Sequence, residues 1–269
     1  MCVDSASRIT PVEDMYSWPS SATVEVCAAP SPSPSPSATV AGDPHLSLAY
    51  GGRADFRGKH GKYYNMLSTP DVSVNALMED AAFKLNKVAI RGSYMTEISM
   101  AVRSNVGRFF NLTISASVAG DAYPISLNGT CDGIDISASS AKYFLLRACD
   151  DVGFSAEHNA VTVTTREWAI KVQGRPIFDR LSGPSRRVDL TMEPRVAEDK
   201  MTALPHGLVG QSFDRSGIPR VGRTDLYPPL SVPGEFETKA MAEGAIAGVA
   251  DDYIVDSKFA TAFKYSVFN

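Results

Sequence analysis

Long apolar runs and clusters of basic residues are both missing from this chain of 269 residues. No stretch approaches the roughly 18 consecutive apolar residues that a membrane-spanning helix requires. Aspartate and glutamate (30) outnumber lysine and arginine (26), which gives a net charge of −4 and a pI near 5.6. Because nucleic-acid-binding surfaces are basic, we expect no nucleic-acid partner. Because no apolar run is long enough, we expect no membrane span. The 44% of hydrophobic residues is enough for a sizeable globular core.

The sequence motifs of common enzyme classes are missing as well. The histidines are His45, His60, His158 and His206, and none of them forms the H-x-x-x-H spacing of a zinc hydrolase. There is no G-x-S-x-G nucleophile motif, no Walker A loop and no G-x-G-x-x-G dinucleotide motif. We therefore predict a non-enzymatic protein, in which His206 makes hydrogen bonds at the start of a strand.

Cysteine is scarce, and the four cysteines include no C-x-x-C pair of the kind found in zinc or redox motifs. The even number fits two disulfides, and proximity in the sequence favours Cys131–Cys149 and Cys2–Cys27. The alternative is that all four are unpaired small hydrophobic residues. Closing the short Cys131–Cys149 loop would contribute about 3 kcal/mol of stability.

The expected compartment follows from the disulfides and from two glycosylation sequons. Asn111-Leu112-Thr113 and Asn128-Gly129-Thr130 both match the N-x-[ST] acceptor pattern. The N-terminus does not look like a secretory signal, because Asp4 is acidic and no apolar run follows it. A fragment of a longer extracellular or cell-surface protein would explain both observations.

The distribution of residues divides the chain near residue 42. Residues 1–41 lack a periodic pattern and contain a regular Pro-Ser alternation from Pro30 to Ser37, which is typical of an extended, disordered linker. Residues 42–269 form the predicted domain. Its strands follow one another with a period of two, which indicates sheets with one buried and one wet face. Examples of this alternation are 72–77, 98–102, 110–114, 161–164, 168–172 and 188–192.

The predicted fold is therefore all-β, an antiparallel β-sandwich or flattened barrel. Residues 236–248 have the composition of a short helix, although Gly244 and Gly248 count against one. The alternation in residues 259–268 predicts a final strand.

Two motifs stand out from this background. The first is Gly42-Asp43-Pro44-His45, followed by an aromatic-Gly pair, Asp55-Phe56 and a Gly-x-Tyr segment; the second is Pro205-His-Gly-Leu-Val-Gly-Gln211. Together they resemble the von Willebrand factor type D domain, in the divergent form seen in plant root-cap proteins and in the C-terminal region of inter-alpha-trypsin inhibitor heavy chains. The resemblance covers roughly residues 42–268. Val209 stands where the cysteine-rich members have cysteine, so mucin-type disulfide polymerisation is not expected.

The resemblance implies two possible chemistries. Some members of the family cleave themselves between the Asp and Pro of GDPH, which here would be Asp43–Pro44 with His45 assisting proton transfer. The alternative, which we favour, is that the motif is a tight structural turn. In cysteine-rich relatives an acidic turn binds calcium, and Asp214 and Asp225 are the matching candidates; a solvated loop is the alternative.

The function that we predict is a structural or adhesive interaction module with protein or glycan partners at a cell surface or in a matrix. One alternative is a carbohydrate-binding module, which would need exposed aromatic side chains, the candidates being Tyr63, Tyr64, Tyr143 and Trp168. Another is a self-cleaving module. No cofactor is expected other than the possible calcium ion.

Overall fold

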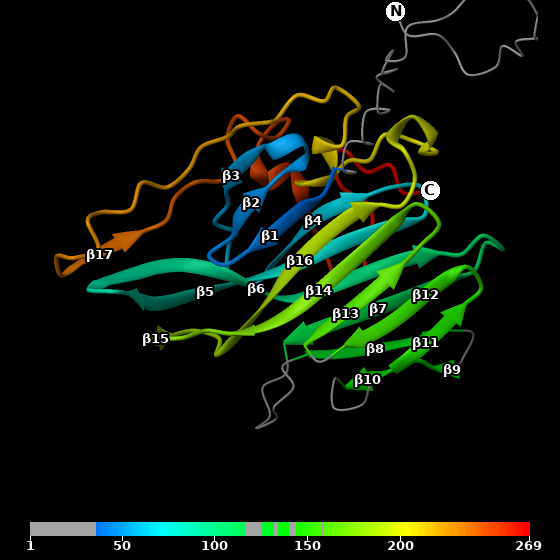
Figure 1. The fold of residues 1–269 in the computed structure, drawn as a ribbon, viewed down its shortest axis with the longest axis horizontal. Coiled ribbons are helices and arrows are strands. Elements are labelled where there is room, and N and C mark those ends of the chain that lie inside the picture. Colours follow the sequence, from blue (N-terminus) through cyan, green and yellow to red (C-terminus); the bar gives the residue numbers. More distant parts are fainter. Residues whose placement is uncertain (1–35, 117–124, 132–133, 140–143, 158) are drawn as a thin grey trace, which may run out of the picture. The chain divides into compact units, whose positions relative to one another are not determined.

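The computed structural model describes residues 36–116, 125–131, 134–139, 144–157 and 159–269. Over these residues the fold is all-β, which confirms the predicted class (Figure 1). Their strands form two large sheets, and every pairing is antiparallel except that of β17 with β6. The helical segments in this part of the chain are 3-10 turns, and none of them is long and apolar enough to cross a membrane.

One sheet has eight strands and contains the two strands that flank the GDPH motif. Its order is β11 (Phe144–Cys149), β12 (Val152–Glu157), β13 (Ala160–Thr164), β14 (Trp168–Pro176), β16 (Arg186–Pro194), β1 (Ala38–Ala41), β2 (His45–Ser47) and β3 (Arg53–Asp55). The sheet therefore includes β1, which lies just before the boundary predicted at residue 42. Residues 1–35, with Cys2, Cys27 and most of the Pro-Ser alternation, lie outside the described residues.

The other sheet has ten strands in the described part of the chain. Its main path is β10 (Ala138–Ser139), β8 (Ile125–Cys131), β7 (Phe109–Ala116), β6 (Val88–Arg103), β5 (Val72–Leu85), β4 (Lys62–Ser68) and β18 (Ile254–Val255). Three short strands join it at the side: β9 (Ile134–Asp135) on β8, β15 (Arg180–Ser182) on β5 and β17 (Gly234–Glu237) on β6. Strands β5 and β6 are long, with 14 and 16 residues, and their far ends carry β15 and β17.

The core lies between the sheets, where β16 and β14 face β6 and β7. The predicted alternation decides which side chains enter it. In β14, Trp168, Ile170 and Val172 are fully buried, and Lys171 between them is exposed. Each such buried side chain contributes roughly 1.5–3 kcal/mol relative to exposure. Trp168 packs edge-on against Phe213, with ring centroids 5.0 Å apart.

In the C-terminal part the predicted final strand is absent, and so is the short helix against which Gly244 and Gly248 counted. Residues 236–248 form no helix, because Ala242, Gly244 and Gly248 have left-handed backbone with φ of 59°, 87° and 65°. Residues 259–268 form no strand. The backbone N–H of Val267 donates to the side-chain oxygen of Ser68 (3.0 Å), and no strand partner pairs with this segment. Alternation within a sequence cannot supply a neighbouring strand edge.

The predicted disulfide between Cys131 and Cys149 is present, with the two Cα atoms 6.2 Å apart. Cys131 ends β8 in the ten-stranded sheet, and Cys149 ends β11 in the eight-stranded sheet. The bond therefore ties the two layers together at one end of the sandwich.

Replacing both cysteines, Cys131→Ser and Cys149→Ser, should lower the free energy of unfolding by about 3 kcal/mol. The two residues are 18 positions apart, and without the bond the unfolded chain is no longer restricted by a closed loop between them. Equilibrium denaturation in urea measures this change. A Cys2→Ser, Cys27→Ser variant is the control for loss of thiol groups. Equal stability of the oxidised wild type and the Cys131/Cys149 variant would contradict the expectation.

Candidate functional site

The GDPH motif forms the tight loop that joins β1 to β2, with Ala41 paired opposite His45. Gly42 has φ of +71°, a conformation in which glycine carries no side-chain penalty. Its N–H donates to the Oδ1 atom of Asp189 in β16 at 3.2 Å. Arg175 and Arg187 form ion pairs with the same carboxylate, so the residue that accepts the hydrogen bond from Gly42 is an ion-paired aspartate.

Asp43 turns inward, and its residue is only 8% exposed. Its Oδ1 atom accepts the backbone N–H of Ser93 in β6 (3.1 Å), and its Oδ2 atom accepts the hydroxyl of Tyr227 (3.2 Å). The neighbouring Gly92 makes room for the carboxylate, because any Cβ atom there would overlap both of its oxygens. One side chain thus joins the GDPH loop, the ten-stranded sheet and the loop that carries Tyr227.

Burial raises the pKa of the Asp43 carboxyl to about 6, and the nearby Asp225 raises it further. The donors Ser93 and Tyr227 and the charge of His45 act in the opposite direction. Desolvation is the larger effect because a carboxylate removed from water loses more than two hydrogen bonds return. The carboxyl group next to the Asp–Pro bond therefore changes charge at mildly acidic pH.

His45 forms a second pair at the same loop. Its Nδ1 atom lies 2.7 Å from Oδ1 of Asp55, the residue paired with it across β2 and β3. A carboxylate can only accept, so Nδ1 is the donor in this contact. The other oxygen of Asp55, Oδ2, accepts the backbone N–H of Asp225 at 2.7 Å. The His45 side chain is about half exposed (52%), whereas Asp55 is buried.

The second motif, PHGLVGQ, has a structural role. The backbone of His206 exchanges two hydrogen bonds with Ser68 of β4, as predicted, but they form an isolated bridge and the strand expected to begin there is absent. The motif then continues into the 3-10 turn η3 (Gly210–Ser212) and not into a strand. Val209 is fully buried, and Gln211 donates to the hydroxyl of Tyr253 (2.8 Å) and accepts the N–H of Ala247 (2.9 Å). This motif therefore anchors the C-terminal part of the chain.

The calcium candidates Asp214 and Asp225 have separate protein partners. Asp214 receives two hydrogen bonds from the guanidinium of Arg220 (3.1 and 2.9 Å) and others from Ser216. Asp225 accepts the backbone N–H groups of Lys239 (2.9 Å) and Ala240 (3.2 Å). Within the described ranges, no group of three or more His, Cys, Asp or Glu residues could hold a metal ion. Calcium binding stays a prediction.

The aromatic candidates for sugar stacking do not form an exposed platform. Tyr64 and Trp168 are fully buried, and Tyr63 is half-buried with its hydroxyl donating to Glu97 (3.0 Å). Tyr143 lies outside the described residues, as does His158. His60 accepts the backbone N–H of Asp80 (3.1 Å) through its Nδ1 atom.

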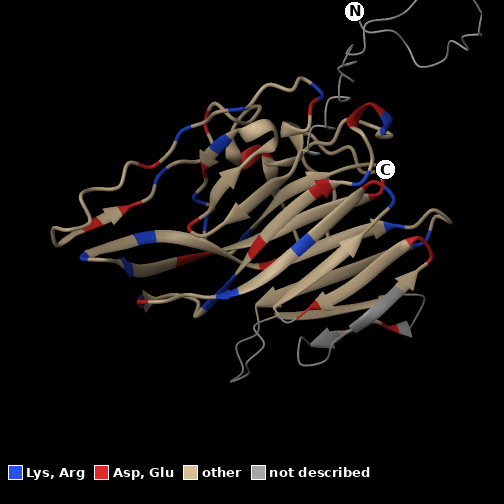
Figure 2. Cartoon of the chain, viewed as in Figure 1, with Lys and Arg blue, Asp and Glu red and all other residues tan. Residues whose placement is uncertain are grey.

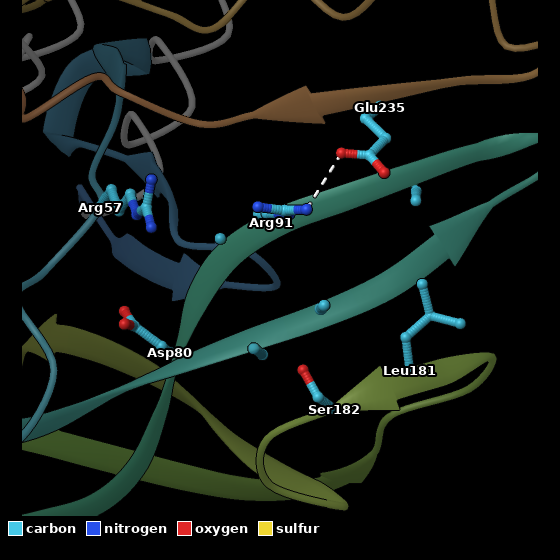
Figure 3. Close-up of a pocket in the computed structure, with 10 residues that line it drawn as sticks. Arg57, Asp80, Arg91, Leu181, Ser182 and Glu235 are labelled. Atoms are coloured by element: carbon cyan, nitrogen blue, oxygen red, sulfur yellow. Dashed lines mark hydrogen bonds and ion pairs between the residues drawn. The ribbon is translucent and has the colours of Figure 1, made fainter.

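A groove of about 460 Å³ lies beside the site, on the extension made by β15, β5, β6 and β17. Figure 3 shows Arg57, Arg91 and Glu235 on one side of it and Leu181 and Ser182 on the other. Arg91 pairs with Glu235 (3.1 Å) and Arg57 with Glu237 (2.6 Å), and charges of both signs are interspersed over the strands in view (Figure 2). Gly92 lines this groove and also faces Asp43.

The sequence motif pointed to Asp43 and His45, and it contained Asp55 without a role for it, but it did not point to Gly92, Ser93 or Tyr227. Ser93 lies 50 positions and Tyr227 lies 184 positions after Asp43 in the chain. No local pattern marks them. No protein-family model matches the chain, and a search of curated proteins finds no match.

The substitution Asp43→Asn should change how stability depends on pH. The folded pKa of about 6 is above the ordinary 3.8, so ionisation of the carboxyl destabilises the fold. This destabilisation is absent below about pH 3.8 and reaches its full size once the pH has risen through about 6. Relative to wild type, the variant should gain about 3 kcal/mol of unfolding free energy across that range, because each pKa unit is worth 1.36 kcal/mol.

Urea denaturation from about pH 4 to about pH 8 measures this difference. Asp252→Asn is the control, because the hydrogen bond from Lys264 lowers the pKa of Asp252 below its ordinary 3.8, so its stability difference from wild type should stay nearly constant over this pH range. Parallel stability curves for wild type and Asp43→Asn would contradict the assignment.

Proposed function

We propose that this chain is a non-catalytic, extracellular interaction module related to the von Willebrand factor type D domain. The observation that carries the proposal is the disulfide that joins the two sheets, because such bonds persist in oxidising compartments. The sequon asparagines agree with it. Asn111 in β7 and Asn128 in β8 are both exposed, so the fold leaves room for glycans at both positions.

The two sequons lie on the same outer face of the ten-stranded sheet. Asn128 is paired with Thr113, and Thr113 shares a face with Asn111 because strand side chains alternate. Glycans on these residues would cover the outer surface of β7 and β8. A partner is therefore expected to contact the other sheet.

The outer face of the eight-stranded sheet carries a row of small polar and charged side chains. In β13, β14, β16 and β1 the paired residues are Thr162, Lys171, Thr191 and Thr39. The hydroxyls of Thr39 and Thr191 lie 3.3 Å apart. These groups donate and accept hydrogen bonds and present little apolar surface, which suits a polar protein or glycan partner.

The test is to add a glycan to that face. Thr162→Asn creates an N-x-T sequon with Thr164, and the chain secreted from eukaryotic cells can be followed by its retention on the matrix that those cells deposit. Wild type should be retained, and the Thr162→Asn glycoform should be lost to the medium because the glycan covers the polar row.

The control is the Asn111→Gln, Asn128→Gln variant, which lacks glycans on the opposite sheet and should be retained like wild type. Equal retention of the Thr162→Asn glycoform and wild type would contradict this contact surface. Free thiols at Cys131 and Cys149 in the secreted protein would contradict the extracellular proposal.

A second candidate function is self-cleavage at Asp43–Pro44, favoured by the buried Asp43 carboxyl with its raised pKa. A carboxyl oxygen of Asp43 would attack the carbonyl carbon of its own residue. The bond to the Pro44 nitrogen breaks, and the carboxyl proton goes to that nitrogen, which leaves as a secondary amine. The five-membered anhydride on Asp43 is then opened by one water molecule. A neutral carboxyl supplies both the nucleophile and the proton, so a pKa near 6 keeps the reactive form populated at mildly acidic pH.

For this second candidate, incubation of the folded chain near its Asp43 pKa of about 6 should yield two fragments, one ending at Asp43 and one beginning at Pro44. The masses must be measured after denaturation, because β1 stays paired with β16 and β2 in the folded protein. Asp43→Asn removes the attacking carboxyl and should abolish the fragments. Cleavage of the folded chain no faster than of a urea-denatured chain would rule out an activated site.

A further inference from the structure

The segment from Asp225 to Tyr227 closes the GDPH loop through two contacts. The backbone N–H of Asp225 donates to Oδ2 of Asp55 (2.7 Å), and the hydroxyl of Tyr227 donates to Oδ2 of Asp43 (3.2 Å). Leu226 between them is 86% exposed, as expected where alternate residues of an extended segment face opposite ways. The segment thus presents one donor to each of the two aspartates of the site.

The loop that carries this segment has little regular structure of its own. Residues 213–233 contain no strand, and the backbone bridge of Val221 to Arg53 holds them before the segment. After it, the ring of Tyr227 packs on Phe236 of β17 with centroids 4.9 Å apart. The carboxylate of Asp225 also holds the segment, because it accepts the backbone N–H groups of Lys239 (2.9 Å) and Ala240 (3.2 Å). The contact that the segment makes with Asp43 itself is the hydrogen bond from Tyr227.

Both oxygens of Asp43 are engaged in this closed arrangement. Ser93 donates from the backbone of β6, which is fixed by its pairing with β5. Tyr227 donates from a side chain on a loop, so its hydrogen bond is the one that can be released without disturbing a sheet. An oxygen that accepts a hydrogen bond is a weaker nucleophile, and it must leave its donor before it can reach the carbonyl carbon of its own residue.

We propose that Tyr227 restrains cleavage of the Asp43–Pro44 bond, holding the carboxyl oxygen away from its own carbonyl carbon and covering the site against water. This rests on the self-cleavage proposed above as the second candidate function. Exclusion of water matters because an anhydride that is not hydrolysed is attacked by the nearby Pro44 amine, which re-forms the peptide bond. Movement of the segment 225–227 away from the loop would release both restraints at once.

Tyr227→Phe tests the restraint because it removes the hydroxyl and keeps the ring. Cleavage of the folded variant should be faster than that of wild type, by a few-fold to roughly tenfold, the change expected for losing one hydrogen bond to the neutral carboxyl. Tyr63→Phe is the matched control, because it removes a tyrosine hydroxyl that donates to another carboxylate, Glu97 (3.0 Å), and should leave the rate unchanged.

A second readout separates a direct contact from a general loss of stability. The pKa of Asp43, followed by carboxyl-carbon NMR, should rise in Tyr227→Phe, because the lost donor stabilises the ionised form. Tyr63→Phe should not change it. Should Tyr227→Phe fail to fold, Phe236→Leu loosens the same segment through the ring contact and should accelerate cleavage in the same direction.

The outcomes distinguish this proposal from the self-cleavage on which it rests. Faster cleavage of Tyr227→Phe supports the restraint, including the case in which wild type stays intact. Equal or slower cleavage of a folded Tyr227→Phe, with wild type cleaved, overturns the restraint alone. Intact wild type and intact variants, with the denatured chain cleaved, overturn self-cleavage and the restraint with it.

Discussion

The burial of one carboxylate, that of Asp43, constrains the arrangement of everything around the GDPH loop. A charged group removed from water must find donors, and here they come from a distant strand and a distant loop, through Ser93 and Tyr227. The same burial requires a residue without a Cβ atom at Gly92, because a larger side chain would occupy the space of the carboxylate. Three segments that are far apart in the sequence are therefore held in register by a single side chain.

This arrangement costs stability at the same carboxyl group for which we propose reactivity. The raised pKa of Asp43 shows that its hydrogen bonds do not fully offset desolvation, so the ionised form is a cost to the fold at neutral pH. Buried groups with perturbed pKa values are common at functional sites, and ion-pair networks of purely structural origin produce them too. A structural turn and a restrained cleavage site use the same contacts. They differ in whether the contact of Tyr227 is ever released.

The sandwich separates this site from the surfaces available to partners. The ten-stranded sheet has two sequon asparagines on its outer face, and the C-terminal residues contact its β4 and β5 through Ser68 and Asn75. The eight-stranded sheet has an outer row of hydroxyl and charged side chains. The inter-sheet disulfide lies at the end where β8 and β11 finish, away in sequence from the motif loop. The proposed partner surface and the site around Asp43 thus involve different residues.

Much of the fold was predictable because burial on one face of a strand imposes a period of two on the sequence. The alternation in 168–172 and 188–192 predicted strands that β14 and β16 confirm, and cysteine proximity predicted the Cys131–Cys149 bond. The same rule failed for residues 259–268. A strand also needs the free edge of a neighbouring strand to pair with, and the alternation of residues does not show which edges are free.

The sequence by itself determined the all-β class through its local alternation, and the resemblance of its GDPH motif singled out Asp43 and His45. Only the tertiary structure decided that Gly92, Ser93 and Tyr227 complete the site. Their contacts to Asp43 span 49 to 184 positions (92 − 43 = 49 for Gly92), and such contacts arise from strand pairing and loop closure, which leave no periodic pattern in the sequence. The tertiary structure also decided that PHGLVGQ is an anchor for the C-terminal segment. Its Gln211 bonds to Ala247 and Tyr253, and these two residues come close to Gln211 only in the folded chain.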